Sequence, residues 1–527
     1  MARPTDIEPI ILAILDGWGN RAEAEANAIA EARTPIFDRL AARGLRTMLA
    51  ASGEAVGLPA DQPGNAEAGH RAIGSGRTEP QFARRIADAI AGNAGGPLSE
   101  NPAVRQLIQK ARSRGSAVHL IGLMSPAGVQ GDQYHLAVLA ATLSHEGIQV
   151  WIHAVLDGED TGAQTGADHL AEFLRDIEGA ENAMLATVMG RRYAFDRLHR
   201  PVQLAPAIKA IAEAGAPVAD YPTTYVADLY NKGVHDADIP PAIMQGYGGL
   251  RQDDVLLLAL LRSDSAAPLI ASLTAHESAD IALPNPVDLS AAYSLTPLSP
   301  PLKEAVQPLF DEQPLSGTLS EALANLGKRQ LYLSDAAFTA TLGNYHRAGR
   351  SLPFGGESHI TVPGPKKQNF EKKPELAILE IADELVRQVK AAAADVMIVH
   401  FPNVALAAHS GDPALTRKAA EIVDKALGKI TAILEKRGGT LMIVGTHGNA
   451  EDMRKDSDGT VNARNTRAAV PLVIDGHPKT FSRLALRPGR LADVGPTLLA
   501  LLGENPPPEM TGEALLVSNE AETDEAV

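Results

Sequence analysis

The chain has 527 residues, of which 45% are hydrophobic, so it is long enough for two or three domains with well-filled cores. Its 48 Lys and Arg residues against 64 Asp and Glu residues leave a net charge of -16, which argues against binding to nucleic acid or to anionic membranes. There is no Cys, which excludes disulfides and thiolate metal sites, and no apolar run approaches the roughly 18 to 20 residues of a membrane helix. We therefore expect a soluble cytoplasmic protein that binds neither nucleic acid nor membranes.

The first predicted element is a buried strand over Ile10–Leu15, because the run is short, apolar throughout and followed by a glycine-rich turn. Asp16 comes directly after it, at the position where open α/β sheets place their ligands. An ordinary turn aspartate is the alternative interpretation of Asp16 taken alone. Thr34 and Pro35 then predict the start of a helix, with a cap residue before a first-turn proline, and Gly44 predicts its end.

The stretch Gln62–His70 has the composition of a ligand-binding loop. Its small residues let the backbone approach a phosphate or a metal closely, and Asn65 and Glu67 supply oxygen atoms. A site of this kind normally presents a nucleophile, usually a serine hydroxyl, at the start of a helix. The central residue here is Ala66, whose methyl group cannot attack a substrate.

Strand-like and helix-like runs alternate through the rest of the chain. The predicted strands are Ala117–Leu123, Val150–Val155, Ala183–Met189, Val255–Leu261, Arg329–Leu333, Met397–His400, Leu441–Val444 and Val470–Ile474. The predicted helices are Leu136–His145, Ala167–Ile177, Ala205–Ala214, Leu376–Ala392, Leu415–Arg437 and Leu491–Leu502. This βαβ rhythm predicts mostly parallel sheets. We expect the Pro- and Ser-rich stretch Ala279–Leu302 to be a linker, and the middle α/β domain to be inserted into the outer one.

Two histidines follow late predicted strands, His409 and His447. A single loop histidine is more typical of a hydrogen-bonding surface residue than of a metal ligand. Together with Asp16, which follows a strand expected in the same sheet, they are candidates for a shared site. A metal-dependent hydrolase site needs three or more ligands for each ion, and the spacing alone supplies only these three.

The middle of the chain contains a basic segment, Gly190–Arg200, with four arginines. Guanidinium groups bind phosphate or carboxylate in bidentate fashion, so this segment is a candidate anion clamp. An exposed charged face is the alternative. The loop Leu156–Thr161 and Arg262 follow other predicted strands and are further candidates for ligand contacts, although each is equally typical of a plain turn.

Taken in order, these segments resemble the cofactor-independent (2,3-bisphosphoglycerate-independent) phosphoglycerate mutases of the alkaline phosphatase superfamily. The most specific parts of the resemblance are Leu15–Gly19, Ala51–Pro59, Gly64–Asn65 with Glu67 and Gly69–His70, Leu156–Gly158, Gly190–Arg191 with Asp196–Arg197, and His447–Glu451. The resemblance implies an α/β fold of two domains. A metal-binding, alkaline-phosphatase-like parallel-sheet domain is expected at 1–80 and 312–527, and an inserted, phosphoglycerate-binding, transferase-like domain at 81–311.

The resemblance also implies a chemistry. In that family two Mn²⁺ ions and a serine nucleophile move a phosphate between the 3- and 2-hydroxyls of glycerate through a phosphoserine. In this chain the serine position is Ala66, two metal-binding aspartates align with Ala405 and Thr446, and a metal-binding histidine aligns with Asn465. The family ligands that remain are Asp16, His409 and His447. Such a partial set would hold an ion only weakly.

The substrate site that the resemblance implies is altered too. The residues that still match it are Asp160, Arg191, Arg197 and Arg262. A family histidine aligns with Gln130, and a family arginine aligns with Glu159, which reverses the charge that faces an anionic substrate. Three further family residues are replaced: a second arginine aligns with Ser265, a lysine with Asp335 and a histidine with Phe338.

These departures together predict a catalytically silent member of the family, a pseudoenzyme with a binding or regulatory role. We expect it to need no cofactor or to hold a metal ion weakly. Its expected ligand is a small phosphorylated or carboxylated molecule, and a protein partner is a further expectation.

Three alternatives remain open at this point. The first is an active phosphoglycerate mutase, an isomerase that interconverts 3- and 2-phosphoglycerate with Mn²⁺ and uses substitute oxygen ligands. The donors available for this are Asn65, Glu67, Asn403 and Asn465. The second is an enzyme of different chemistry that uses the remaining aspartate and histidines as acid–base groups. The third is a subunit that binds partner proteins through its helices.

Overall fold

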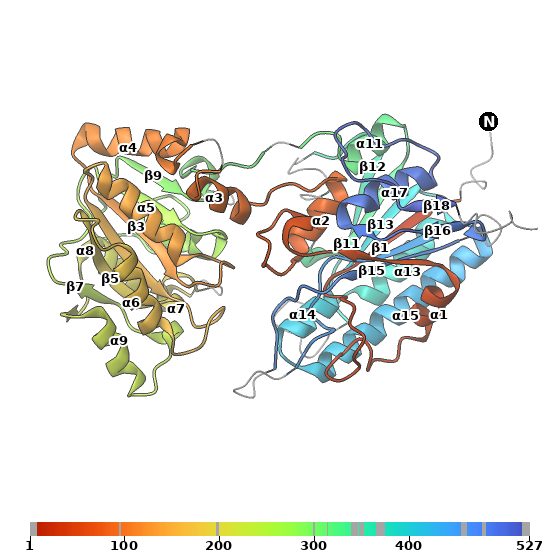
Figure 1. Ribbon diagram of the computed structural model, residues 1–527, viewed down its shortest axis with the longest axis horizontal. Helices are drawn as coiled ribbons and strands as arrows, with labels where there is room; N and C mark the ends of the chain where they lie inside the picture. The colour runs from red at the N-terminus through yellow and green to blue at the C-terminus, as the bar shows by residue number, and fades with distance from the viewer. Residues whose placement is uncertain are drawn as a thin grey trace, which may run out of the picture. The chain divides into compact units, whose positions relative to one another are not determined.

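The computed structural model describes residues 8–93, 96–196, 200–298, 301–313, 315–338, 346, 352–364, 375–454, 461–476 and 481–518. The chain divides into two compact units (Figure 1). Unit 1 comprises Met1–Gln81 and Pro314–Val527, and unit 2 comprises Phe82–Gln313. The domain boundaries predicted from the sequence fall after residues 80 and 311, close to these divisions. What each unit binds stays a prediction.

Unit 1 is built on an eight-stranded sheet. The strand order is β12 (Glu357–Val362), β11 (Gln330–Asp335), β13 (Val396–Phe401), β1 (Ile10–Leu15), β14 (Thr440–Gly445), β15 (Val470–Asp475), β2 (Leu45–Ala50) and β17 (Gly489–Arg490). Neighbouring strands are parallel except at β15, which runs antiparallel to both β14 and β2. A separate pair is formed by β16 (Leu484–Leu486) and β18 (Leu516–Ser518). The prediction of a mostly parallel α/β sheet is therefore confirmed.

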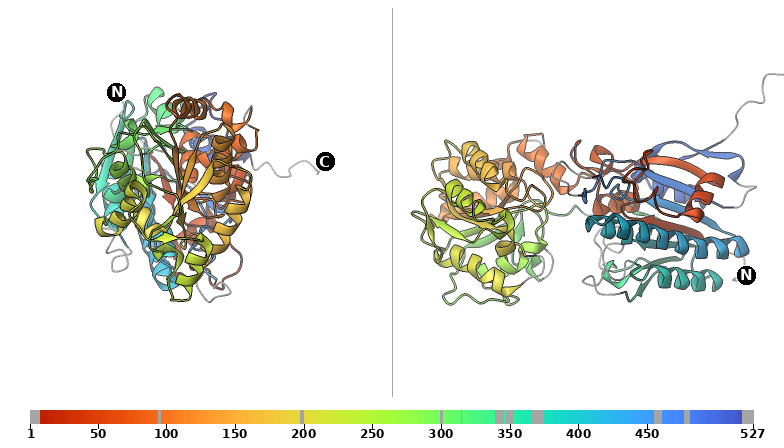
Figure 2. Two further views of the ribbon diagram at one scale, coloured as in Figure 1. Left: turned by 90° about the vertical axis from the view of Figure 1, so that its left-hand side faces the viewer. Right: turned by 90° about the horizontal axis from the view of Figure 1, so that it is seen from below.

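Helices cover both faces of this sheet (Figures 1 and 2). The helices of unit 1 are α1 (Pro35–Arg43), α2 (Ala66–Ser75), α11 (Leu319–Asn325), α13 (Ile378–Lys390), α14 (Asn403–His409), α15 (Pro413–Arg437) and α17 (Val494–Leu501). In β1, Ile11 and Ala13 pack with α13 and α15, whereas Leu12 and Ile14 pack with α2 and α17. Because both faces of β1 are buried, its sequence is apolar at every position rather than alternating.

Helix α1 begins and ends where the sequence predicts, but Thr34 does not cap it. The Thr34 side chain makes no capping bond to the helix backbone, and its hydroxyl contacts Asp38 at 3.3 Å instead. The first amides of the helix are satisfied by Asp424 from α15, whose Oδ1 accepts from the backbone N–H of Ile36 at 3.0 Å and of Phe37 at 2.7 Å. A carboxylate from a distant helix has taken the role that the local sequence assigned to threonine.

Unit 2 contains a second eight-stranded sheet, again mostly parallel. Its strand order is β10 (Gln307–Pro308), β9 (Ala291–Ser294), β8 (Val255–Ala259), β3 (Val118–Met124), β4 (Val150–Leu156), β5 (Ala183–Gly190), β7 (Ala242–Met244) and β6 (Val218–Ala219). Its helices are α3 (Phe82–Ile90), α4 (Pro102–Arg114), α5 (Gln133–His145), α6 (Gly166–Asp176), α7 (Arg191–Ala194), α8 (Pro201–Glu213), α9 (Pro222–Tyr230) and α10 (Ala267–Leu273). The stretch predicted as a linker is wrong in part, since it contains β9, which pairs in parallel with β8.

The longest described helix, α15, has 25 residues and carries charged side chains along one face, among them Arg417, Glu421 and Lys429. Among the described residues, no helix combines the length and the apolarity needed to cross a bilayer.

Candidate functional site

The candidate site lies at the carboxyl ends of three neighbouring strands of unit 1. In the parallel register, Leu15 at the end of β1 lies opposite Phe401 of β13 and Gly445 of β14. Asp16 follows β1 directly, and Thr446 follows β14 directly. The strands β1 and β14 therefore bring Asp16 and Thr446 to one edge of the sheet, where β13 supplies His400, its next-to-last residue, and where open α/β sheets bind ligands.

Asp16 is the centre of this site and is 4% exposed. Its Oδ1 lies 3.1 Å from His70 Nε2 and accepts a hydrogen bond from Thr446 Oγ1 at 2.8 Å, and its Oδ2 lies 2.7 Å from His400 Nε2. Burial alone would raise the pKa of Asp16, but the two imidazoles attract and hydrogen-bond its ionised form and hold the pKa well below its usual value. The carboxylate is thus ionised and held by two imidazole rings and a hydroxyl.

His70 reaches Asp16 because α2 packs directly on the end of β14. The side chain of Asn65 caps α2 by accepting from the backbone N–H of Ala68 at 2.9 Å. One turn further on, a Cβ at Gly69 would lie 2.6 Å from the carbonyl oxygen of Thr446, so only glycine permits this approach. His70 is fully buried, and burial lowers its pKa, which favours the neutral ring.

Ala66 is the first residue of α2, so the sequence loop does lead into a helix start. The loop before it is tightly packed: a Cβ at Gly64 would lie 2.0 Å from the carbonyl oxygen of Ala51 and 3.2 Å from His447 Cβ. The frame expected of a nucleophile loop is therefore present. Its first helical residue carries a methyl group where the resemblance implies a serine hydroxyl.

Thr446 connects Asp16 to His447. Its hydroxyl lies 2.8 Å from Asp16 Oδ1 and 2.8 Å from His447 Nδ1. One hydroxyl can donate to the carboxylate and accept from the imidazole N–H at the same time. The position that the resemblance assigns to a metal-binding aspartate thus carries a neutral hydroxyl that is engaged within the protein.

The other candidate positions lie around the exposed His409, at the end of α14. Its Nδ1 is 2.9 Å from the carbonyl oxygen of Ala463, and Asn449 Nδ2 is 3.3 Å away. Asn449 also donates to Asn465 Oδ1 at 3.0 Å, and Asn465 donates to the carbonyl oxygen of Gly64 at 2.9 Å. Where the resemblance implies a metal-binding histidine, Asn465 is thus an amide that bridges two loops.

Ala405 stands at the start of α14, close to Asp16. Its backbone N–H donates to the Asp16 carbonyl oxygen at 3.1 Å, and a Cβ at Gly17 would lie 2.9 Å from the Ala405 methyl group. With a methyl group at Ala405, a hydroxyl at Thr446 and an amide at Asn465, these residues do not fit the two-ion site that the resemblance implies.

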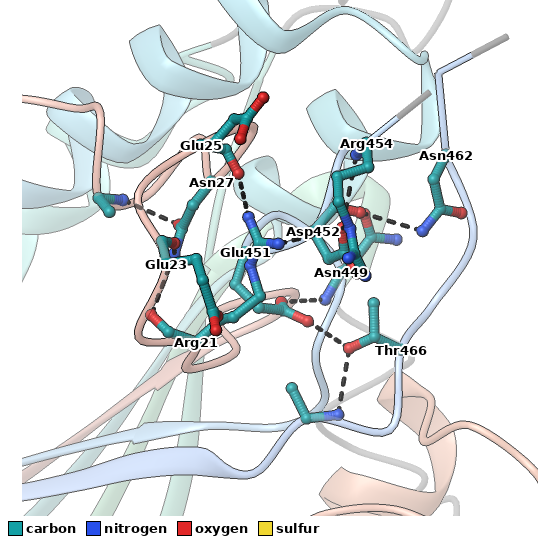
Figure 3. Close-up of polar contacts among 12 residues, drawn as sticks. Arg21, Glu23, Glu25, Asn27, Asn449, Glu451, Asp452, Arg454, Asn462 and Thr466 are labelled. Carbon is teal, nitrogen blue, oxygen red and sulfur yellow. Dashed lines mark hydrogen bonds and ion pairs between the residues drawn. The ribbon is translucent and has the colours of Figure 1, made fainter. Parts of the chain in front are cut away.

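The segment after His447 has a structural role (Figure 3). Glu451 is completely buried and accepts hydrogen bonds from the Thr466 hydroxyl and from the backbone N–H of Asn449, the latter at 2.7 Å. A Cβ at Gly19 would lie 2.1 Å from Glu451 Oε2, so the glycine of the first loop is required by this carboxylate. Burial raises the pKa of Glu451. The segment joins loops of unit 1, and within the described part of the chain Glu451 belongs to no group of side chains that converges on an ion.

Neighbouring contacts extend this network to the loop after β1 (Figure 3). Arg21 lies 3.6 Å from Asp452, and the side chain of Asn27 donates to the carbonyl oxygens of Arg21 at 3.2 Å and Glu23 at 3.1 Å. Asn462 donates to the Asp452 carbonyl oxygen at 3.0 Å. These contacts hold the two loops that carry Asp16 and His447 against each other.

Among the described residues, one group of His, Asp and Glu side chains can converge on a single ion: Asp16, His70 and His400, whose ligand atoms all lie within 4.8 Å of one another. Of the three predicted ligand remnants, only Asp16 belongs to it. The two histidines were not predicted as ligands, because His400 lies inside an apolar strand and His70 belongs to the glycine-containing stretch Gln62–His70. The signal available in the sequence was a histidine that closes the predicted apolar strand Met397–His400, since a polar side chain in a buried strand needs a partner.

In unit 2, the predicted anion ligand Arg191 is already surrounded by carboxylates. It is 1% exposed, and its guanidinium donates to Asp157 Oδ1 and Gln130 Oε1. Glu159 Oε2 lies 3.5 Å and Asp160 Oδ2 lies 3.6 Å from its terminal nitrogens. Three carboxylates around one guanidinium leave this site with a net negative charge, which disfavours an anionic ligand.

The other predicted substrate residues are placed differently. Arg262 is exposed, and its backbone N–H donates to the Gln130 carbonyl oxygen at 3.2 Å. Ser265 accepts a hydrogen bond from the Gln130 side chain, so the two substituted residues satisfy each other. Arg197 lies outside the described residues. In unit 1, Asp335 is buried at the end of β11 and Phe338 is partly buried.

Comparisons with known proteins agree with this architecture. The sequence profile of the metalloenzyme superfamily matches residues 8–506. The chain is 34% identical over 508 residues to a 2,3-bisphosphoglycerate-independent phosphoglycerate mutase of Rhodopseudomonas palustris, which covers 96% of this chain and 99% of that protein. A protein of the same name from Gluconobacter oxydans is 33% identical, with coverage of 98% and 100%. A crystal structure of Leishmania mexicana phosphoglycerate mutase at low cobalt concentration shares the fold, with a TM-score of 0.79, 24% identity and coverage of 97% and 98%.

Proposed function

This chain belongs to the cofactor-independent phosphoglycerate mutase family of the metalloenzyme superfamily, and from that premise we propose that it is a member without mutase activity that acts as a binding or regulatory protein. The observation that carries the proposal is Ala66 at the start of α2, inside a loop whose packing is otherwise intact. A methyl group has no lone pair with which to accept a phosphoryl group, so a covalent route through this position is closed.

The surroundings of Asp16 support the same proposal. Phosphoryl transfer depends on cations that neutralise charge on the transferred group. The family positions for those cations carry Ala405, Thr446 and Asn465, and the last two are hydrogen-bonded to other protein groups. Loss of a nucleophile costs several orders of magnitude in rate, and losing the ion ligands as well leaves little catalytic power.

The residues around Arg191 in unit 2 also support the proposal that the protein lacks mutase activity. A phosphoglycerate has to compete with Asp157, Glu159 and Asp160 for one guanidinium. We propose that a small phosphorylated or carboxylated ligand, if it binds here, does so through the exposed Arg262 and with low affinity. A partner protein is the other proposed binding target, and co-purification of the full chain separates the two.

Membership of a metalloenzyme superfamily favours a bound metal ion over the absence of any cofactor. The expectation that no cofactor is needed therefore has no support from the comparisons. A bound ion would not contradict the proposed inactivity, because an ion can stabilise a fold without taking part in a reaction.

The test is a coupled mutase assay of the full chain with 3-phosphoglycerate and Mn²⁺. The matched positive control is the Rhodopseudomonas palustris relative, prepared and assayed in the same way. We expect no turnover above the background of heat-denatured protein. A rate within about tenfold of the control would overturn the proposal.

A second candidate function is mutase activity with substitute ligands, an intramolecular phosphotransfer that makes the protein an isomerase. The observation that favours it is the near-complete coverage of relatives that bear the mutase name. In that case an acceptor other than Ala66 must carry the phosphate. Mass spectrometry of acid-quenched protein after incubation with 3-phosphoglycerate would find a phosphorylated residue, whereas the silent protein would show none.

A further inference from the structure

We propose that Asp16, His70 and His400 form a buried binding site for a single Zn²⁺-like ion, with a ligand set that shares only Asp16 with the metal ligands that the family resemblance implies. The three side chains come from the end of β1, from α2 and from β13. Two of them, His70 and His400, are absent from the set of family ligands identified in the sequence. The inference goes beyond the proposed function, since it assigns an ion to the protein but no reaction.

The distances among the three side chains suit one ion. His70 Nε2 and His400 Nε2 are 3.3 Å apart, and Asp16 Oδ1 is 3.1 Å from His70 Nε2. A tetrahedral Zn²⁺ with bonds of about 2.05 Å separates its ligand atoms by about 3.3 to 3.4 Å. Small movements of the side chains would therefore place all three atoms on one ion.

The ring orientations point the same way. Both histidines turn Nε2 toward one carboxylate and toward each other, although only one proton per ring is available when the rings are neutral. For ligation through Nε2 the proton must sit on Nδ1. In His70 that nitrogen faces His346 Nε2 at 3.4 Å, which can accept it. In His400, Nδ1 has no hydrogen-bond partner among the described residues, so no described group opposes this tautomer.

The chemistry of the three donors selects the kind of ion. Two imidazoles and a carboxylate match the borderline-soft Zn²⁺ better than Mg²⁺ or Ca²⁺, which prefer oxygen ligands. The Thr446 hydroxyl lies 2.8 Å from Asp16 Oδ1 and 2.8 Å from His447 Nδ1, so it is a neutral neighbour held by other groups and the fourth position of the ion is left to water. His70 and His400 are completely buried, which is typical of an ion that holds structure together.

A bound ion would connect three elements that are far apart in the sequence, namely β1, α2 and β13. An ion here would attach α2, and with it the altered loop Gln62–His70, to β1 and β13. It would also supply a positive charge to the buried Asp16 carboxylate, which lies between two imidazole rings and a hydroxyl. The family fold would then keep an ion near its original position through ligands of different origin.

The test measures Zn²⁺ binding by isothermal titration calorimetry on full-length protein stripped with a chelator. We expect one equivalent to bind to the unsubstituted chain. His400→Asn should weaken binding by more than about tenfold, whereas His409→Asn, which removes a family-type ligand at an exposed position, should leave the affinity unchanged. Absence of binding to the unsubstituted chain would overturn the inference, and so would loss of binding in His409→Asn with retention in His400→Asn.

A second measurement does not depend on a variant of a buried residue. Co²⁺ bound to the unsubstituted chain should show the strong visible absorption of a four-coordinate ion, and X-ray absorption should count two imidazoles. A six-coordinate, oxygen-only spectrum would contradict the assignment. Because neither readout uses the mutase assay, failure of the ion site and failure of the proposed inactivity are distinguishable.

Discussion

Asp16 directly follows β1, and its Oδ2 lies 2.7 Å from Nε2 of His400, which lies on the neighbouring parallel strand β13. Asp16 is the carboxylate that the resemblance assigns to a metal ion, and His400 stands on a strand that the sequence predicts as plain core. The contact explains how the site can keep its ionised aspartate while the residues aligned with family ligands have become alanine, threonine and asparagine. An imidazole now supplies the nearest partner of that charge.

We expect that Ala66→Ser does not restore mutase activity. The serine would stand at the first position of α2, but Ala405, Thr446 and Asn465 would still leave it without the cations that phosphoryl transfer needs. The coupled assay with Mn²⁺ should give the same background rate as the unsubstituted chain. Turnover by this single variant would show that the ion ligands are not limiting.

We expect that removal of metal lowers the thermal stability of the unsubstituted chain but not of His400→Asn. An ion at a free concentration 100 times its Kd adds about 2.7 kcal/mol to the stability of the folded state. Differential scanning calorimetry with and without chelator measures the change in Tm. The control is His409→Asn, which should respond to the chelator as the unsubstituted chain does. Equal responses of all three proteins would contradict the buried ion site.

We expect that Glu159→Gln strengthens the binding of 3-phosphoglycerate to unit 2 by about two- to fivefold at low ionic strength. The change removes a negative charge 3.5 Å from the Arg191 guanidinium, and the effect is small because the Glu159 side chain is 40% exposed and solvent screens its charge. Calorimetric titration measures it, and added salt should reduce the difference. Glu178→Gln, an exposed change of the same charge in the same unit, is the matched control and should leave the affinity unaltered.

We expect the stability of unit 2 to fall as the pH drops below about 6.5, in part because of His153. Burial, and next the neighbouring His119, hold the pKa of His153 well below its usual value. The unfolded chain therefore binds a proton at this residue at a higher pH than the folded chain does. The stabilising difference is complete above the unfolded pKa and is lost as the pH falls toward the folded one.

This pH effect can be assigned by substitution. His153 Nε2 is 3.1 Å from His119 Nδ1, and His153 Nδ1 is 3.0 Å from the Thr187 hydroxyl. His153→Gln keeps a polar side chain but removes the titrating group. The slope of its unfolding free energy against pH should therefore be smaller than that of the unsubstituted chain, by up to about 1.4 kcal/mol per pH unit. Urea unfolding of the full chain at a series of pH values gives the comparison. Parallel pH profiles of the two proteins would show that His153 does not contribute.

We expect that Gly69→Ala destabilises unit 1 by about 1 to 3 kcal/mol. Its new Cβ would lie 2.6 Å from the Thr446 carbonyl oxygen and would push α2 away from the end of β14. Gly428→Ala is the control within α15, where the nearest atom to the new Cβ outside the helix backbone would be Ile36 Cγ1 at 3.4 Å, an ordinary contact. That change should be neutral or slightly stabilising, as is usual for alanine in a helix. Urea unfolding monitored by circular dichroism measures both, and equal effects would mean that α2 does not press on β14.

Much of the fold follows from local patterns. The apolar runs predict the ends of β1, β4 and β13 to within one residue. The reason is that strands buried on both faces need apolar side chains throughout. Strand β9 was not predicted, since Ala291–Ser294 is short and stands in a Pro- and Ser-rich stretch. Its pairing with β8 is a long-range interaction that local composition does not report.

The family, the two α/β units and the alanine at position 66 can all be recognised without a structure, because each depends on residue type and order along the chain. Which side chains meet depends on the folded arrangement. His70 and His400 are 330 positions apart and share one carboxylate, while His409 stands with Asn449. The physical reason is that parallel strands bring their carboxyl ends to one edge, and a glycine at position 69 lets α2 pack against that edge. Neither the register nor the close approach is visible in the spacing of the residues.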